Sequence, residues 1–195
     1  MPAGRRVAFD PHVALEAAMQ TFWTRGYAAT SLQDLLASMG LSKSSLYQTY
    51  GSKQQLFERC IDHYRHQFTA TLAARLETAP SALDFIRDTL YAATDEIRHG
   101  HPRRGCLIMN TASEIGQDNE EIARHVSEGI RALHRIFQRA VERAQAEGDI
   151  PLERDSATLA HYLVTHLAGL HTMVKAGASR RETKATAATA LRALG

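Results

Sequence analysis

The sequence has few of the residues that mark several large protein classes. It contains two cysteines and one tryptophan in 195 residues. Two cysteines in a chain of this length do not build the disulfide framework of a secreted domain, so we expect a reducing, cytoplasmic location. No stretch approaches the roughly 18 consecutive apolar residues of a membrane span, and residues 1–9 lack the apolar run of a secretory signal. These absences predict a cytoplasmic protein without membrane contact.

Motifs of enzymatic chemistry are also missing. The patterns GxxxxGK, HExxH, CxxC and GxSxG do not occur, so we expect neither an enzyme nor a cofactor. Three of the ten histidines, His161, His166 and His171, recur every five residues. Five residues turn a helix by about 500°, which points successive side chains about 140° apart, so they do not share a metal. His63 and His66 are better spaced but lack a third ligand, and we expect no metal site.

Net charge is small, but its distribution is uneven. The formal net charge is +2, and residues 1–53 hold five basic and three acidic side chains. Residues 54–195 hold 18 of each sign. The whole excess therefore lies in the first quarter of the chain, which is consistent with an end that faces phosphate. The hydrophobic fraction of 44% is enough to build a packed core.

The sequence is rich in apolar residues at helical spacing. Leu15, Ala18, Met19 and Phe22, for example, recur at i, i+3, i+4 and i+7. Glycine, proline and capping residues divide the chain, with Asp10 as the first cap and capping boxes at Thr30/Gln33 and Ser52/Gln55. The predicted fold class is all-α, with about nine helices and no strand. The expected helices cover about 11–25, 30–39, 42–50, 52–79, 81–98, 105–116, 119–147, 155–176 and 180–194.

The segment 30–53 has the plan of a helix-turn-helix, two short helices meeting at a turn that contains Gly40. If Leu46 and Tyr50 point inward, Gln48 points directly outward, because each helical residue turns by 100°. A glutamine can pair with adenine through two hydrogen bonds. The alternative is two small packing helices with a polar surface. We predict a three-helix DNA-binding domain at 1–53 and a helical effector-binding and dimerisation domain at 54–195.

Residues from Ala8 to Phe57 resemble the tetracycline-repressor (TetR) family of bacterial regulators. The matching pieces are 22–27, Thr30–Ser31, 40–50 and Ser52–Lys53, whereas Tyr50 replaces a frequent phenylalanine and Gly51 precedes Ser52. The resemblance implies a homodimer that binds operator DNA and is released by a small molecule. It places Thr30, Lys43, Tyr47 and Lys53 at the DNA backbone and Ser44, Ser45 and Gln48 at the bases. The candidate DNA-binding residues are Thr30, Ser31, Lys43, Ser44, Ser45, Tyr47, Gln48, Thr49 and Lys53.

The remaining residues give less specific predictions. By family position, helices 155–176 and 180–194 form the dimer interface, and an apolar surface from Ala160 to Leu170 is available for it. The alternative is that this surface is buried within one subunit. A pocket of mixed lining would favour effector sensing, whereas a solid core would favour a DNA-binding protein without an effector. The candidate ligand-binding residues are Phe85, Tyr91, Cys106, Met109, Asn110, His134, Phe137 and His166.

Cys106 has two interpretations. Gly105–Cys106–Leu107 is similar to a segment in a TetR subgroup, some members of which use this cysteine to sense electrophiles or oxidants. A cysteine at a helix N-terminus behind Arg103 and Arg104 would favour the thiolate. The alternative is a small buried hydrophobic side chain. The second functional prediction is therefore a repressor that senses redox state or electrophiles through Cys106.

Overall fold

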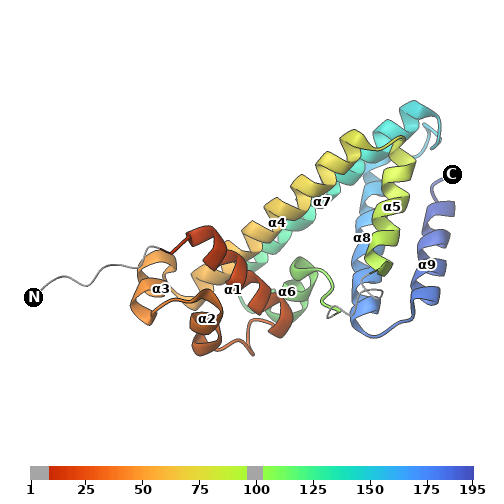
Figure 1. Ribbon diagram of the computed structural model, residues 1–195. Helices are drawn as coiled ribbons and strands as arrows, with labels where there is room; N and C mark the ends of the chain where they lie inside the picture. Colours follow the sequence, from red (N-terminus) through yellow and green to blue (C-terminus); the bar gives the residue numbers. More distant parts are fainter. Residues whose placement is uncertain (1–8, 96–102) are drawn as a thin grey trace, which may run out of the picture. The chain divides into compact units, whose positions relative to one another are not determined.

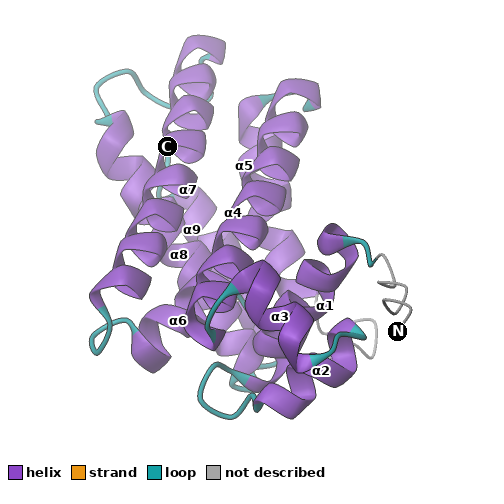
Figure 2. Cartoon of the chain, turned by 90° about the vertical axis from the view of Figure 1, so that its left-hand side faces the viewer, coloured by secondary structure: helices purple, strands orange, loops and turns teal. Residues whose placement is uncertain are grey.

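The computed structural model describes residues 9–95 and 103–195, and within these ranges it contains nine helices and no strand (Figures 1 and 2). This confirms the predicted all-α class. The helices are α1 Pro11–Arg25, α2 Leu32–Met39, α3 Lys43–Tyr50, α4 Lys53–Thr78, α5 Ala82–Asp95, α6 Leu107–Ile115, α7 Glu120–Glu147, α8 Ser156–Lys175 and α9 Arg180–Arg192. Two compact units divide the chain within α4, at Met1–Tyr64 and Arg65–Gly195.

Aromatic and aliphatic side chains form the core of the first unit. Phe22 of α1 is 1% exposed, and its ring lies 4.7 Å from that of Phe57 at the start of α4. Trp23 packs edge-on against Tyr64, with ring centroids 4.9 Å apart. The first helix begins as predicted, because Asp10 accepts a hydrogen bond from the His12 amide at 2.8 Å. These contacts fix α1 against α4 and make a base for the two short helices between them.

The start of α2 differs from the predicted one. Its N-cap is Ser31, and the capping box joins Ser31 to Asp34 instead of Thr30 to Gln33. The Asp34 amide donates to Ser31 Oγ at 3.1 Å, and the Ser31 amide donates to Asp34 Oδ2 at 2.9 Å. Thr30 is not available as a cap because its hydroxyl donates to the Gly26 carbonyl at 2.6 Å and its side chain is buried. The prediction for this helix start was therefore wrong by one residue.

The start of α4 confirms the second predicted capping box. The Gln55 amide donates to Ser52 Oγ at 3.1 Å, and the Ser52 amide donates to Gln55 Oε1 at 2.8 Å. Gly51, the residue that departs from the family pattern, has a φ of +77°. A Cβ atom at this position would overlap the Gln55 side-chain amide. Glycine at position 51 thus leaves room for the capping box.

In the second unit, α5, α7, α8 and α9 pack around one hydrophobic core. Among these helices, α7 runs in the same direction as α4 (Figure 1). Arg65 pairs with Glu128 at 3.3 Å and Glu77 with Arg139 at 2.6 Å, so residue numbers increase in the same direction along both helices. The predicted helix 81–98 is observed as α5 up to Asp95, and its expected end lies outside the described residues. Asn119 and Asp155 are the N-cap residues of α7 and α8, and their side chains accept hydrogen bonds from the Ile122 and Thr158 amides.

Candidate nucleic-acid interface

The turn before α3 is built by backbone geometry and one cap. Gly40 has φ +64° and ψ +30°, a left-handed conformation that L side chains avoid. Ser42 then caps α3 by accepting a hydrogen bond from the Ser45 amide at 3.2 Å. On the inner side of the helix, Leu46 and Tyr50 are 0% and 3% exposed. Tyr50 also donates its hydroxyl to the Pro11 carbonyl at 2.8 Å, which fixes α3 against the start of α1.

The outer side of α3 is open, as the 100° rotation per residue predicts. Lys43, Ser44, Tyr47 and Gln48 are exposed, whereas Ser45 and Thr49 are partly buried. Tyr47 is 47% exposed, which is high for a large aromatic side chain. The open face is short, polar and free of acidic groups, so it can approach the edges of base pairs without repelling phosphate.

Two lysines lie at the start of helices in this unit. Lys43 is the first residue of α3 and is exposed, and Lys53 is the first residue of α4. The Lys53 ammonium lies 4.4 Å from the ring centroid of Tyr27, which positions the charge by a cation–π contact. Both are placed where helix N-terminal amides add to the attraction for phosphate. This arrangement suits contacts to the DNA backbone.

The other two candidate DNA-binding residues, Thr30 and Ser31, use their side chains for contacts within their own unit. The Thr30 side chain is fully buried, and Ser31 belongs to the capping box of α2. Asp34, the partner of Ser31, also pairs with Arg25 at 3.0 Å. Hydrogen bonds from Ser31 lower the pKa of the Asp34 carboxyl. In this conformation the two side chains order the start of α2.

A hollow of about 500 Å³ lies beside α3, and sequence reasoning missed it. Phe9, the Gly40–Ser42 turn and one flank of α3 line it. Phe9 precedes the Asp10 cap and belongs to no helix, so periodicity gives no sign of its position. Because Gln48 is among the lining residues, the hollow adjoins the open face of α3.

The structure separates the predicted ligand-binding residues into several places. Phe85 and Phe137 are brought together in the core, with ring centroids 6.2 Å apart. His166 lies in a groove of about 620 Å³ along α8 and α9. His134 hydrogen-bonds to the Ala157 carbonyl at 3.1 Å. Asn110 donates to the Arg104 carbonyl at 2.7 Å. Tyr91 and Met109 are partly buried and Cys106 is buried.

Two buried polar atoms outside the predicted ligand-binding set lie in the same unit. Thr89 Oγ1 on α5 and His171 Nδ1 on α8 have no hydrogen-bond partner among the described residues. The two side chains are 3% and 8% exposed. Three other buried threonines of this unit donate to carbonyls of their own helices, namely Thr94, Thr111 and Thr183. Burial lowers the pKa of His171 to about 4, so its ring is neutral at physiological pH.

The fold and the open face of α3 define a helix-turn-helix protein of the type that regulates transcription. Residues 14–60 match the family of bacterial regulatory proteins called the tetR family. Residues 82–190 match the tetracyclin repressor-like C-terminal domain. The chain therefore belongs to the TetR family of transcriptional regulators, as the resemblance predicted.

Similar proteins agree with this membership. An uncharacterized HTH-type transcriptional regulator of Bacillus subtilis, YezE, is 34% identical over 161 residues, which cover 82% of this chain and 83% of YezE. The HTH-type transcriptional repressor ComR of Escherichia coli is 30% identical over 190 residues, 97% of this chain and 90% of ComR. A cysteine mutant of the regulator CifR, solved with 26-base-pair operator DNA, is 32% identical with a TM-score of 0.86 and covers 98% of this chain and 100% of that one. None of the described helices is long and apolar enough to cross a membrane.

Proposed function

We propose that this protein regulates transcription by binding operator DNA through α3, most simply as a repressor in the cytoplasm. The observation that carries the proposal is the open face of α3, where Ser44, Tyr47 and Gln48 are exposed on a helix whose other side is buried. Lys43 and Lys53 provide the phosphate contacts, with Ser45 and Thr49 on the shoulders of the face. The names of two relatives support it, since ComR is a repressor and CifR was solved on an operator.

Selection from a random duplex library tests this function directly. The full-length protein should enrich one sequence, and that sequence should compete for binding far better than a scrambled duplex. Recovery of no common sequence would contradict the proposal. Sites recovered from the source genome would then identify the controlled genes and the direction of control.

We propose further that the protein acts as a homodimer through α8 and α9. The apolar residues of α8 that the sequence offered for this contact are core residues, since Leu163 and Leu167 are 0% and 3% exposed within one chain. The groove on the other side of α8 and α9 is the candidate. Met173 there is 55% exposed, and a Cβ atom added at Gly169 would meet nothing within 4 Å.

We propose also that a small-molecule effector binds beside Thr89 Oγ1 and His171 Nδ1, which have no hydrogen-bond partner among the described residues. Buried polar groups are nearly always hydrogen-bonded, and an exception calls for a partner outside the described residues. Thr89 and His171 lie on α5 and α8, which pack against each other. No aspartate, glutamate, lysine or arginine is buried among the described residues of this unit. These side chains match the chemistry of an uncharged, largely apolar molecule with one or two hydrogen-bonding groups.

A thermal-shift screen with uncharged aromatic and aliphatic compounds tests the effector. A binder should raise the melting temperature of the wild-type protein and lower its affinity for the selected duplex. In Thr89→Val, which keeps the shape of the side chain, both effects should be smaller. An equal response in wild type and Thr89→Val would remove Thr89 from the effector site, and His171→Leu repeats the test at the second atom.

The second candidate function is electrophile or redox sensing through Cys106. Cys106 is the N-cap residue of α6, and its side chain makes no capping hydrogen bond. Cys60 is the internal control, because it is fully buried and burial raises the pKa of its thiol. Because Cys106 is itself only 3% exposed, sensing requires the segment around it to open. A mild electrophile should then label Cys106 before Cys60, and Cys106→Ser protein should stay on DNA at the dose that releases the wild type.

A further inference from the structure

The hollow beside α3 has three walls. Phe9 forms one wall, Leu41 of the turn forms another, and Ser45, Gln48 and Thr49 of α3 form the third. Two hydrogen bonds lie next to these walls. The Asp10 carboxylate caps α1 directly after Phe9, and the Tyr50 hydroxyl ties α3 to the Pro11 carbonyl. Phe9 therefore directly precedes a helix start that is itself tied to α3.

The hollow continues the open face of α3. Ser45, Gln48 and Thr49 are spaced i, i+3 and i+4, so they form one flank of the helix. Gln48 belongs both to this flank and to the outermost part of the helix. Stacked base pairs follow each other by about 3.4 Å along the duplex, so a base next to the one that contacts the Gln48 amide is close enough to lie over the hollow.

The lining selects the chemistry of the occupant. None of the described residues that line the hollow carries a charge, so a phosphate there would have no ion-pair partner among them. Its two largest side chains, Phe9 and Leu41, are apolar. Among the groups that base pairs present in the major groove, the C5-methyl of thymine is the apolar one, and phenylalanine is among the side chains that contact it.

We propose that this hollow receives the C5-methyl group of a thymine that adjoins the base contacted by Gln48, and that Phe9 determines specificity at this position. The inference rests on the proposed DNA-reading function of α3. It adds a reading position outside the recognition helix, supplied by the residue before α1. The hollow is larger than a methyl group, so the methyl enters together with the edge of its base.

Deoxyuridine substitution tests the contact, since deoxyuridine differs from thymidine only by this methyl. The probe is the duplex selected by the wild-type protein, with each thymine replaced in turn by uracil. One thymine in each half-site should be sensitive, and its replacement should weaken wild-type binding about fourfold, the effect of about one buried methylene-sized group. Phe9→Ala should bind the thymine and uracil duplexes equally, whereas Phe9→Leu should keep most of the preference.

Val13→Ala is the matched control, because Val13 is an apolar residue of α1 that is 66% exposed and does not line the hollow. It should keep the full preference for thymine. The assignment is overturned if no thymine is sensitive in the wild type, or if Phe9→Ala keeps the wild-type ratio of thymine to uracil affinity. Failure to select any duplex is a different result and contradicts the proposed function itself.

Discussion

Gln48 and Lys53 offer a duplex two different kinds of contact. Gln48 presents an amide at the outermost position of α3, where its donor and acceptor can match one base edge. Lys53 presents a charge held over the Tyr27 ring, and a charge attracts phosphate whatever the sequence. The two residues therefore separate specificity from general affinity, and mutations at these positions should have different signatures.

We expect Gln48→Ala to lose about 1–3 kcal/mol on the selected duplex and to relax the preference at one base position, because the lost contact is specific to a base. Binding to a scrambled duplex should change little. The measurement is fluorescence anisotropy on both duplexes. Gln33→Ala, which removes an exposed amide from α2, is the control. Equal losses of Gln48→Ala on both duplexes would refute the base-reading role.

Lys53→Ala should weaken binding to both duplexes by a similar factor, because the lost contact is to phosphate. The slope of log affinity against log salt should flatten by about one unit. Titrations at several salt concentrations measure this slope. An unchanged slope would show that the ammonium stays over Tyr27 without reaching DNA.

His171 links stability to pH. Its folded pKa of about 4 lies below the ordinary value of 6.5, so between these values the unfolded chain binds the extra proton. The contribution of the neutral ring is therefore complete above about pH 6.5 and is lost as the pH falls towards 4. Each unit of difference in pKa corresponds to about 1.4 kcal/mol, so the loss reaches roughly 3 kcal/mol.

His171→Leu should remove this part of the pH dependence. Urea unfolding followed by circular dichroism, repeated across the interval, should give a smaller decline in the free energy of unfolding than in the wild type. His161→Leu on the same helix is the control, because His161 is exposed. Parallel declines in His171→Leu and wild type would mean that other groups dominate.

At the scale of elements, helix ends were predictable where one residue alone satisfied the geometry. The Asp10–Pro11 start and the Ser52/Gln55 box follow from side chains whose only local role is to cap. The start of α2 was not predictable in this way, because Thr30 and Ser31 can both cap. The choice depends on the Gly26 carbonyl, which accepts the Thr30 hydroxyl after the turn has folded.

The α2 capping box gives a prediction that distinguishes these two alternatives. Asp34→Ala should measurably destabilise the first unit, because it removes the partner of the Ser31 amide and the ion pair with Arg25. Gln33→Ala should have no measurable effect. Trp23, the only tryptophan of the chain, lies in this unit, so its fluorescence reports the unfolding of this unit. A larger loss in Gln33→Ala would restore the box expected from the sequence.

The residues of the candidate sites were also predictable only in part. The inward and outward faces of α3 follow from helical rotation alone, and burial confirms them. The wall formed by Phe9 and the unpartnered Thr89 could not be found from periodicity. The first lies outside any helix, and the second becomes visible only when its neighbours are known to donate to their own helices.

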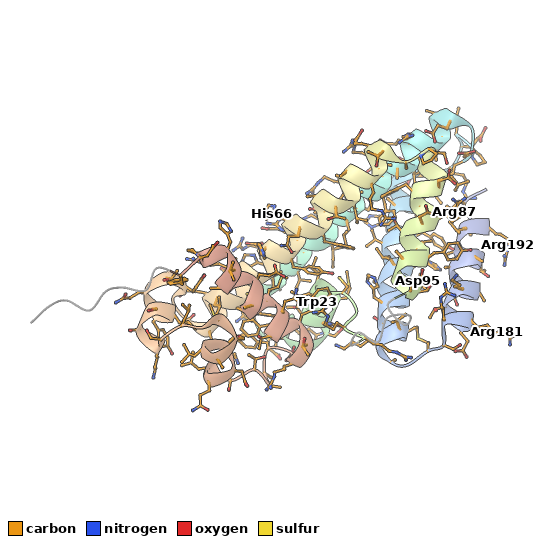
Figure 3. The ribbon with its side chains drawn as sticks, viewed as in Figure 1. Trp23, His66, Arg87, Asp95, Arg181 and Arg192 are labelled. Carbon is orange, nitrogen blue, oxygen red and sulfur yellow. The ribbon has the colours of Figure 1, made fainter. Side chains whose placement is uncertain are left out.

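At the scale of the whole molecule, the sequence left open whether the apolar face of α8 packs inside one chain or against a second copy. Helical spacing places Leu163 and Leu167 on an apolar face but does not show whether this face packs inside one chain. The structure buries both, so the homodimer that we propose would use the side with Gly169 and Met173 instead. On α9, Arg181 and Arg192 extend away from α5 and α8 (Figure 3). We expect these charges to lie at the rim of the dimer interface.

A charge in this groove should separate the copies without unfolding them. We expect Met173→Glu to give monomers by light scattering with unchanged helical content, because Met173 is 55% exposed in the single chain. Leu152→Glu is the control, since Leu152 is 76% exposed but lies outside the groove. It should remain dimeric. Leu167→Glu should instead reduce helical content, because it places a charge in the core.

The proposed dimer also predicts the form of the operator. Two reading helices related by a two-fold axis need two half-sites, so the selected duplex should be a near-palindrome with half-sites about 34–36 Å apart or at a multiple of this distance. A monomer holds only one half-site and loses the gain from simultaneous binding. Met173→Glu should therefore bind the full duplex and a single half-site with similar affinity, whereas wild type and Leu152→Glu prefer the full duplex. An unchanged dimer in Met173→Glu would place the interface elsewhere on the second unit.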